Sequence, residues 1–122
     1  MSDTDSYPRD ADVPNLARGY TRKGRAGKGR VLNHATLPGR GSSAGGGYST
    51  AGDLLKYVQA LKDGKIALPD SASGLGIAGG APGINSTLDW DPRSGDVVIV
   101  LTNFDPPTAG RASRQILNWL PQ

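Results

Sequence analysis

The sequence predicts an α+β fold in which an antiparallel β-hairpin or small antiparallel sheet packs against two helices, behind a disordered basic N-terminal segment. Apolar residues recur at helical spacing over 51–63 and again near the C-terminus, and strand-forming residues interrupted by a turn fill 84–101. Residues 1–47 show neither the helical nor the strand periodicity of apolar residues. We therefore expect two parts: a mostly disordered Gly/Arg-rich segment over 1–47 and a partial α+β domain over 48–122.

The predicted disordered segment has an uneven charge distribution. Its first residues are acidic, whereas the stretch from Arg18 to Arg40 holds seven basic residues and no acidic one. Such a stretch could neutralise several phosphates, and Tyr20 offers a stacking surface. A solvated basic loop is the commoner meaning of this composition, so nucleic acid is kept only as an alternative partner. The candidate phosphate contacts are Arg18, Arg22, Lys23, Arg25, Lys28 and Arg30.

A helix is predicted from near Ala51 to near Asp63. Thr50 and Asp53 have the spacing of an N-terminal capping pair, and Gly64 lies where a left-handed C-cap belongs. The apolar stripe of this helix, which needs a sheet to cover it, consists of Leu54, Leu55, Val58 and Leu61.

A β-hairpin is predicted after a region of turns. Residues 66–83 are rich in Gly, Pro and Ser, which predicts turns with a thin apolar component. Residues 84–90 then alternate apolar and polar side chains, and the segment 91–96 reverses the chain. Because 97–101 is apolar at every position, we expect the second strand to be covered on both faces.

The last predicted element is a C-terminal helix that packs on the hairpin. Pro106 and Pro107 suit its first turn, and either Asp105 or the Thr108 hydroxyl could cap it. Its predicted apolar face consists of Ala112, Ile116, Leu117 and Leu120.

Composition excludes several kinds of site. The chain has no Cys, which excludes disulfides, thiolate nucleophiles and Cys-ligated metal centres. His34 is the only histidine, and since a metal needs several converging ligands we expect no metal site. Residues 74–79 match a dinucleotide-binding fingerprint, but residues 80–83 would break the helix it requires, so we expect no cofactor.

No apolar run suits a signal peptide or reaches the roughly 18 residues of a membrane span, so we expect a cytoplasmic protein without a membrane partner.

One short string suggests a nucleophile. Residues 41–45 match the G-x-S-x-G pattern of a nucleophile elbow, in which a strained Ser lies between a strand and a helix. No strand is predicted before this string, and the imidazole of His34 lies upstream rather than after an acidic residue. Ser43 is therefore a weak candidate nucleophile.

Two longer segments carry a resemblance to a known family. They are RGSSAGGGYSTAGDLLKYVQALKDGK and GGAPGINSTLDWDPRSGDVVIVLTNFDPP, and the stretch GYTR precedes them. From about Ala17 to the end, the chain resembles the C-terminal third of serine hydrolases of the β-lactamase and penicillin-binding-protein type, related to class C β-lactamases.

The resemblance implies a family chemistry that this chain lacks. The family uses a Ser-x-x-Lys pair, a Tyr-x-Asn element and a Lys or His followed by x-Gly on a strand that lines the cleft. No Ser here has Lys three residues later, and no Tyr has Asn two residues later. Aligned on the family's turn, the third element falls at Ile77, so a remnant cleft strand keeps Gly79 and Gly80 but loses the charged side chain. The resemblance therefore implies a truncated homologue that is catalytically inactive alone.

The resemblance also implies a role in association. Strands that border the hairpin in the family are absent, and an unpaired strand edge favours self-association. Two alternatives stay open: a hydrolase that acts through Ser43 or complements a partner chain supplying Ser-x-x-Lys, and a basic protein that binds nucleic acid.

Overall fold

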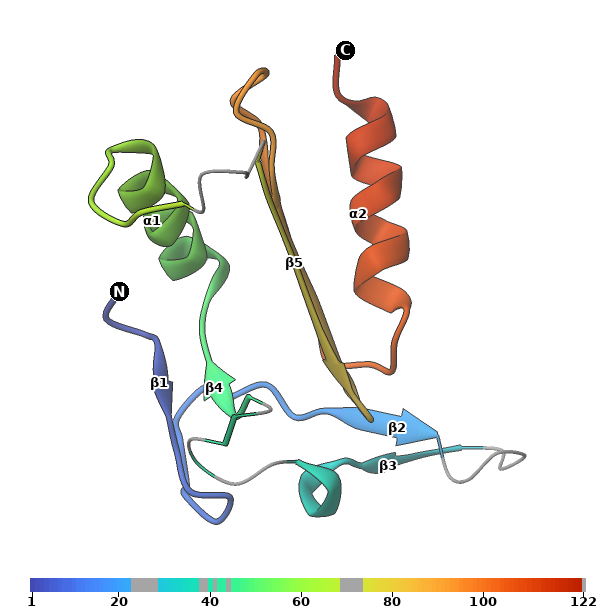
Figure 1. The fold of residues 1–122 in the computed structure, drawn as a ribbon. Helices are drawn as coiled ribbons and strands as arrows, with labels where there is room; N and C mark the ends of the chain where they lie inside the picture. Colours follow the sequence, from blue (N-terminus) through green and yellow to red (C-terminus); the bar gives the residue numbers. More distant parts are fainter. Residues whose placement is uncertain (23–28, 38–39, 41, 44, 69–73, 122) are drawn as a thin grey trace.

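The structure, a computed structural model, describes residues 1–22, 29–37, 40, 42–43, 45–68 and 74–121. A three-stranded antiparallel sheet lies between two helices, and Figure 1 shows the sheet edge-on with one helix on each side. This arrangement confirms the predicted α+β class. The central elements are α1 (Ala51–Lys62), β5 (Leu75–Ala81), β6 (Ile84–Trp90), β7 (Val97–Thr102) and α2 (Thr108–Trp119).

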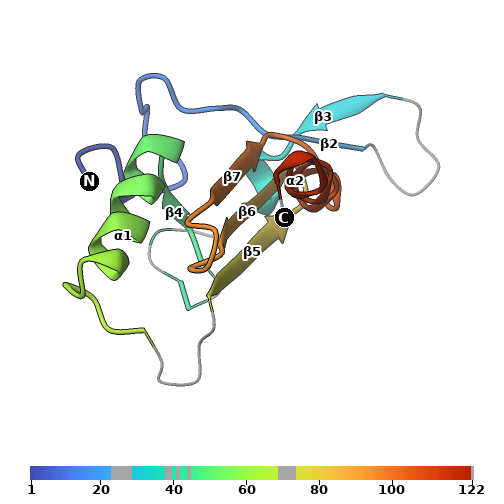
Figure 2. The same ribbon diagram turned by 90° about the horizontal axis from the view of Figure 1, so that it is seen from above.

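β6 and β7 form the predicted hairpin at the centre of the molecule. Leu88 of β6 pairs with Ile99 of β7 on one side and with Ile77 of β5 on the other. Since side chains alternate along a strand, these three lie on one face of the sheet. Ile77 and Leu88 line a pocket together with residues of α1, so this face lies toward α1. The opposite face points to α2, where the Ser113 hydroxyl donates to Asp89 at 2.6 Å. Both faces of the hairpin therefore carry a helix, as Figure 2 shows from above.

α1 begins and ends close to where the sequence predicts. The Thr50 hydroxyl accepts a hydrogen bond from the Asp53 backbone N–H at 3.2 Å, which confirms the N-terminal cap. Gly64 follows the helix with a φ of 68°, a left-handed conformation that a Cβ would strain. Val58 and Leu61 are the buried apolar residues of α1, and they face the sheet.

α2 packs on the opposite face of the hairpin, as predicted, but its N-terminal cap differs from the prediction. Neither Asp105 nor Thr108 provides a side-chain cap. The Asp105 carboxylate accepts from two backbone N–H groups elsewhere, at 2.7 and 3.1 Å. Instead, Asn85 of β6 accepts from the Ala109 N–H at 2.8 Å. The helix is thus capped by the strand against which it packs.

β5 corrects the prediction of turns in the glycine-rich region. Residues of this strand pair with β6 over its full length, which places Ile77, Gly79 and Gly80 in a strand. Close packing favours the glycines, because a Cβ at Gly80 would lie 2.8 Å from the Pro106 Cγ. A glycine run has no apolar alternation, so the strand depends on its partner and not on a local pattern.

Among the described residues of the first 48, four short strands lie in two pairs, where the sequence predicted none. β1 (Asp5–Ser6) pairs with β4 (Gly47–Tyr48), and β2 (Tyr20–Arg22) pairs with β3 (Arg30–Leu32). A short 3-10 helix, η1, covers His34–Thr36. Strands of two or three residues leave no periodicity in a sequence, so pairing patterns of this kind escape prediction.

Polar contacts join this N-terminal part to the helix–sheet sandwich. Asn33 is 3% exposed and donates from Nδ2 to the Pro82 carbonyl at 2.9 Å, in the turn between β5 and β6. The Tyr20 N–H donates to the Asn103 carbonyl at 2.9 Å, just beyond β7. In Figure 1, β2 and β3 accordingly lie across one end of the sheet. Disorder within 1–47 stays a prediction.

Candidate functional site

A small apolar pocket lies between α1 and the sheet. Ile77 of β5, the predicted cleft strand, is one of its lining residues. The volume of the pocket is about 120 Å³, which is below the roughly 300–1,000 Å³ of typical small-molecule sites. Two residues of α1 and four residues of the sheet line it. These are Leu54, Tyr57, Ile77, Ser86, Thr87 and Leu88.

Ile77 brings no charge or hydrogen-bonding group to this pocket. Its side chain is 47% exposed and lies beside Leu88 on the same sheet face. A Cβ at Gly79 would lie 3.1 Å from the Ser86 Oγ, so the glycine lets the neighbouring strand approach closely. The described lining residues carry hydroxyl groups but no ionisable amine, imidazole or carboxylate. It suits an apolar group better than a step that moves a proton.

The lysines of α1 and its C-terminal turn decide whether a serine here could be activated. An amine within hydrogen-bond reach would be needed to take the hydroxyl proton. Lys56 Nζ donates to Asp53 at 2.8 Å, Lys62 Nζ to the Gly95 carbonyl at 3.0 Å, and Lys65 Nζ to Asp63 at 2.9 Å. Within the described part of the chain, none of these lysines donates to a serine hydroxyl.

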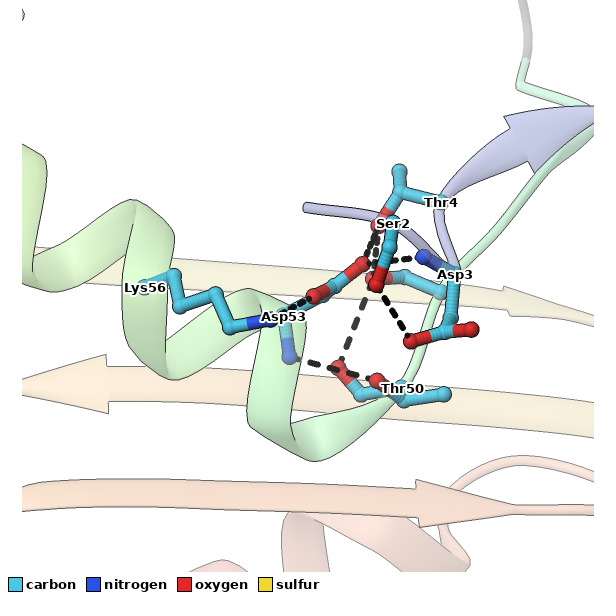
Figure 3. Close-up of polar contacts among 7 residues, drawn as sticks. Ser2, Asp3, Thr4, Thr50, Asp53 and Lys56 are labelled. Carbon is cyan, nitrogen blue, oxygen red and sulfur yellow. Dashed lines mark hydrogen bonds and ion pairs between the residues drawn. The ribbon is translucent and has the colours of Figure 1, made fainter.

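The most extensive polar cluster of the described chain is centred on Asp53, in the first turn of α1. Figure 3 shows the N-terminal residues meeting this carboxylate. Asp53 is 1% exposed and accepts from the Asp3 backbone N–H at 2.7 Å and from the Thr4 hydroxyl at 2.9 Å. The third partner of the carboxylate is Lys56, which donates from Nζ at 2.8 Å and whose own side chain is exposed. The sequence predicted only a capping role for Asp53, because nothing local indicates that residues 3 and 4 return to it.

The Asp53 cluster is built to hold a charge and not to transfer a proton. The hydrogen bond from Lys56 lowers the pKa of the Asp53 carboxyl well below its usual range, and the Asp3 and Thr4 bonds add to this against the opposing effect of burial. Asp53 in turn raises the pKa of Lys56. A carboxylate with so low a pKa is a weak base at neutral pH, and an ammonium with a raised pKa keeps its proton. Asp53 anchors the N-terminus to α1 through its bonds to Asp3 and Thr4.

Ser43 does not lie in a nucleophile elbow. It is exposed in a turn after η1, and β4 separates it from α1, which begins at Ala51. The neighbouring Ser42 hydroxyl donates to the Gly45 carbonyl at 3.1 Å. Among the described residues, no hydrogen bond joins Ser43 to His34. Gly41 and Ala44 of the string lie outside the described residues.

The predicted basic residues are only partly described. Arg22 and Arg30 pair directly across β2 and β3, and Arg18 is exposed just before β2. The structure therefore brings two of the six candidates together. Lys23, Arg25 and Lys28 lie outside the described residues.

Comparison with known proteins gives a match of fold without a match of sequence. The sequence matches no protein-family model, and no curated protein matches it at a significant level. The structure is similar to the crystal structure of a penicillin binding protein from Bacillus halodurans, with a TM-score of 0.75 and 22% sequence identity. The match covers 93% of this chain and 44% of that one, so the chain spans less than half the length of the protein it resembles.

This likeness supports a fold of the penicillin-binding-protein and β-lactamase type. The fold of the chain therefore agrees with the fold that the sequence resemblance implied. No helix in the described ranges is long and apolar enough to cross a membrane. Across the same ranges, no three His or Asp side chains gather where a metal ion could be held.

Proposed function

We propose that this chain is a homologue of β-lactamase-like serine hydrolases that contributes one wall of a cleft and does not catalyse acyl transfer alone. The observation that carries the proposal is the position of Ile77. It lies on β5, lines the pocket between α1 and the sheet, and occupies the place where the resemblance requires Lys or His. An aliphatic side chain there cannot orient a carboxylate or relay a proton.

The lysine contacts support the same proposal. An acyl-enzyme requires a hydroxyl whose proton is accepted by a nearby base. Lys56, Lys62 and Lys65 are each engaged with carboxylates or a carbonyl. Removing the nucleophile of a serine protease costs on the order of a millionfold in kcat, so a chain without this pair should be inert in an ordinary assay.

The proposal is tested with a chromogenic cephalosporin and a short-chain nitrophenyl ester. We expect turnover of both to equal that of a heat-denatured sample. Ser43→Ala, with Ser42→Ala as the matched control, examines the alternative that an isolated serine acts. Turnover that copurifies with the chain and disappears only in the Ser43 variant would establish the hydrolase alternative instead.

Self-association is the second function to test. β7 lies at the edge of the three-stranded sheet, and Leu101 near its end is 44% exposed. An unpaired edge with apolar side chains favours pairing with another strand. We expect light scattering to show dimers that Leu101→Lys disrupts, whereas Leu55→Lys, on the exposed side of α1, leaves them intact. A monomer at every concentration would remove this proposal.

A further inference from the structure

A second pocket lies at the N-terminal end of α2, where β2 and β3 cross the end of the sheet. Its volume is about 220 Å³, and it is more polar than the pocket beside α1. Three separate parts of the chain contribute to it: β2 with β3, the segment after β7, and the first turn of α2. The lining residues are Arg22, Arg30, Phe104, Asp105, Pro106, Pro107, Thr108 and Arg111.

Three arginines line this pocket. Arg22 and Arg30 lie directly opposite each other in the β2–β3 pair, and like charges in such a position destabilise a strand pair. Arg111 joins them from α2, about eighty residues later in the sequence. Among the described residues, none of the three forms an ion pair with a carboxylate. Asp105 is the one carboxylate among the described lining residues of this pocket.

The remaining groups of the pocket do not cancel this charge. Asp105 also lines it, but its two oxygens already accept from the Gly83 and Arg22 backbone N–H groups, at 2.7 and 3.1 Å. The Thr21 hydroxyl and these bonds lower the pKa of Asp105, so it stays ionised as a single negative charge. Three guanidiniums against one carboxylate leave a net charge of about +2 at the pocket.

The geometry of the arginines suits a phosphate group. Arg30 is held with its guanidinium carbon 4.1 Å from the centre of the Phe104 ring, which limits its freedom. The pocket also opens at the first turn of α2, where the helix dipole favours an anion. Guanidinium groups bind phosphate oxygens in pairs of hydrogen bonds. The volume lies below the roughly 300–1,000 Å³ of typical ligand sites, so it accommodates one anionic group and little else.

We propose that this pocket, here called the arginine pocket, binds a small phosphate-bearing anion through Arg22, Arg30 and Arg111. The site is distinct from the cleft beside Ile77 and does not depend on the proposed loss of hydrolase activity. The bound anion would also join β2 and β3 to the first turn of α2. Nucleic acid is the competing source of phosphate, and the test separates the two.

The test is a titration of the full chain with inorganic phosphate, followed by amide chemical shifts and compared with sodium chloride at equal ionic strength. We expect saturable shifts at Arg22 and Thr108 with phosphate only. Arg30→Gln and Arg111→Gln should each weaken binding by about tenfold, the loss expected for one charge-assisted contact. Arg93→Gln is the matched control, because Arg93 lies in the hairpin turn at the other end of β6 and should leave the affinity unchanged within about twofold.

Two outcomes would overturn the proposal. The first is equal shifts with phosphate and chloride, or an unchanged phosphate affinity in the double variant of Arg30 and Arg111. These positions are exposed, so their variants should fold, and circular dichroism checks this. The second is tight binding of a labelled RNA dodecamer whose affinity falls steeply with salt, which would assign the arginines to a polymer backbone.

Discussion

Replacing Asn85 by Ala should destabilise the protein more than its partial exposure suggests. The Asn85 side chain makes two bonds: Oδ1 accepts from the Ala109 N–H at 2.8 Å, and Nδ2 donates to the Gly79 carbonyl at 2.8 Å. Loss of a helix cap costs about 1 kcal/mol, and loss of the second hydrogen bond adds about 1 kcal/mol. We expect the free energy of unfolding to fall by about 2 kcal/mol, which lowers Tm by about 8 °C in a chain of this size.

Urea unfolding followed by tryptophan fluorescence measures this change. Asn118→Ala is the matched control, because Asn118 is exposed on α2 and should change the free energy by less than about 0.5 kcal/mol. Asn85→Asp keeps the acceptor at the helix N-terminus and should fall between wild type and Asn85→Ala. An Asn85→Ala variant as stable as the Asn118 control would refute the reasoning that β6 caps α2.

Three further perturbations test the fold. Leu88→Ala should reduce the free energy of unfolding by about 3 kcal/mol, because Leu88 is 4% exposed, whereas Leu55→Ala at an exposed site should cost far less in the same urea titration. Gly64→Ala should cost about 1 kcal/mol, because its φ of 68° is strained for any residue with a Cβ; an unchanged urea midpoint would contradict this. Asp53 has a folded-state pKa below its unfolded value of 3.8, so its stabilisation is present above that pH and is lost as pH falls toward the folded pKa. Asp53→Asn should therefore be less stable at pH 7 and less sensitive to acid below about pH 4, as measured by unfolding curves at each pH.

The sequence predicted the elements whose signals are local. Thr50 and Gly64 mark the two ends of α1 because a cap and a left-handed residue act within a few positions of the chain. The hairpin followed from alternation in β6 and the branched residues of β7. These features depend on neighbours in sequence, so a pattern could reveal them.

The features that the sequence did not predict depend on distant partners. β5 exists because its glycines pair with β6, and α2 is capped by Asn85 from a strand more than twenty residues earlier. The return of Asp3 to Asp53 is likewise invisible in any short window. Of the candidate sites, Ile77 came from the family resemblance, and Arg22 and Arg30 came from charge. Arg111 was missed, because only the fold brings it beside them.

The proposed function requires that this chain forms no acyl-enzyme by itself. Intact-mass spectrometry after incubation with a fluorescent penicillin at high concentration tests it most directly, since a covalent acyl group adds the mass of the penicillin whether or not turnover follows. We expect a single unmodified mass. A stoichiometric adduct that maps to one serine and is absent from the corresponding Ser→Ala variant would contradict it.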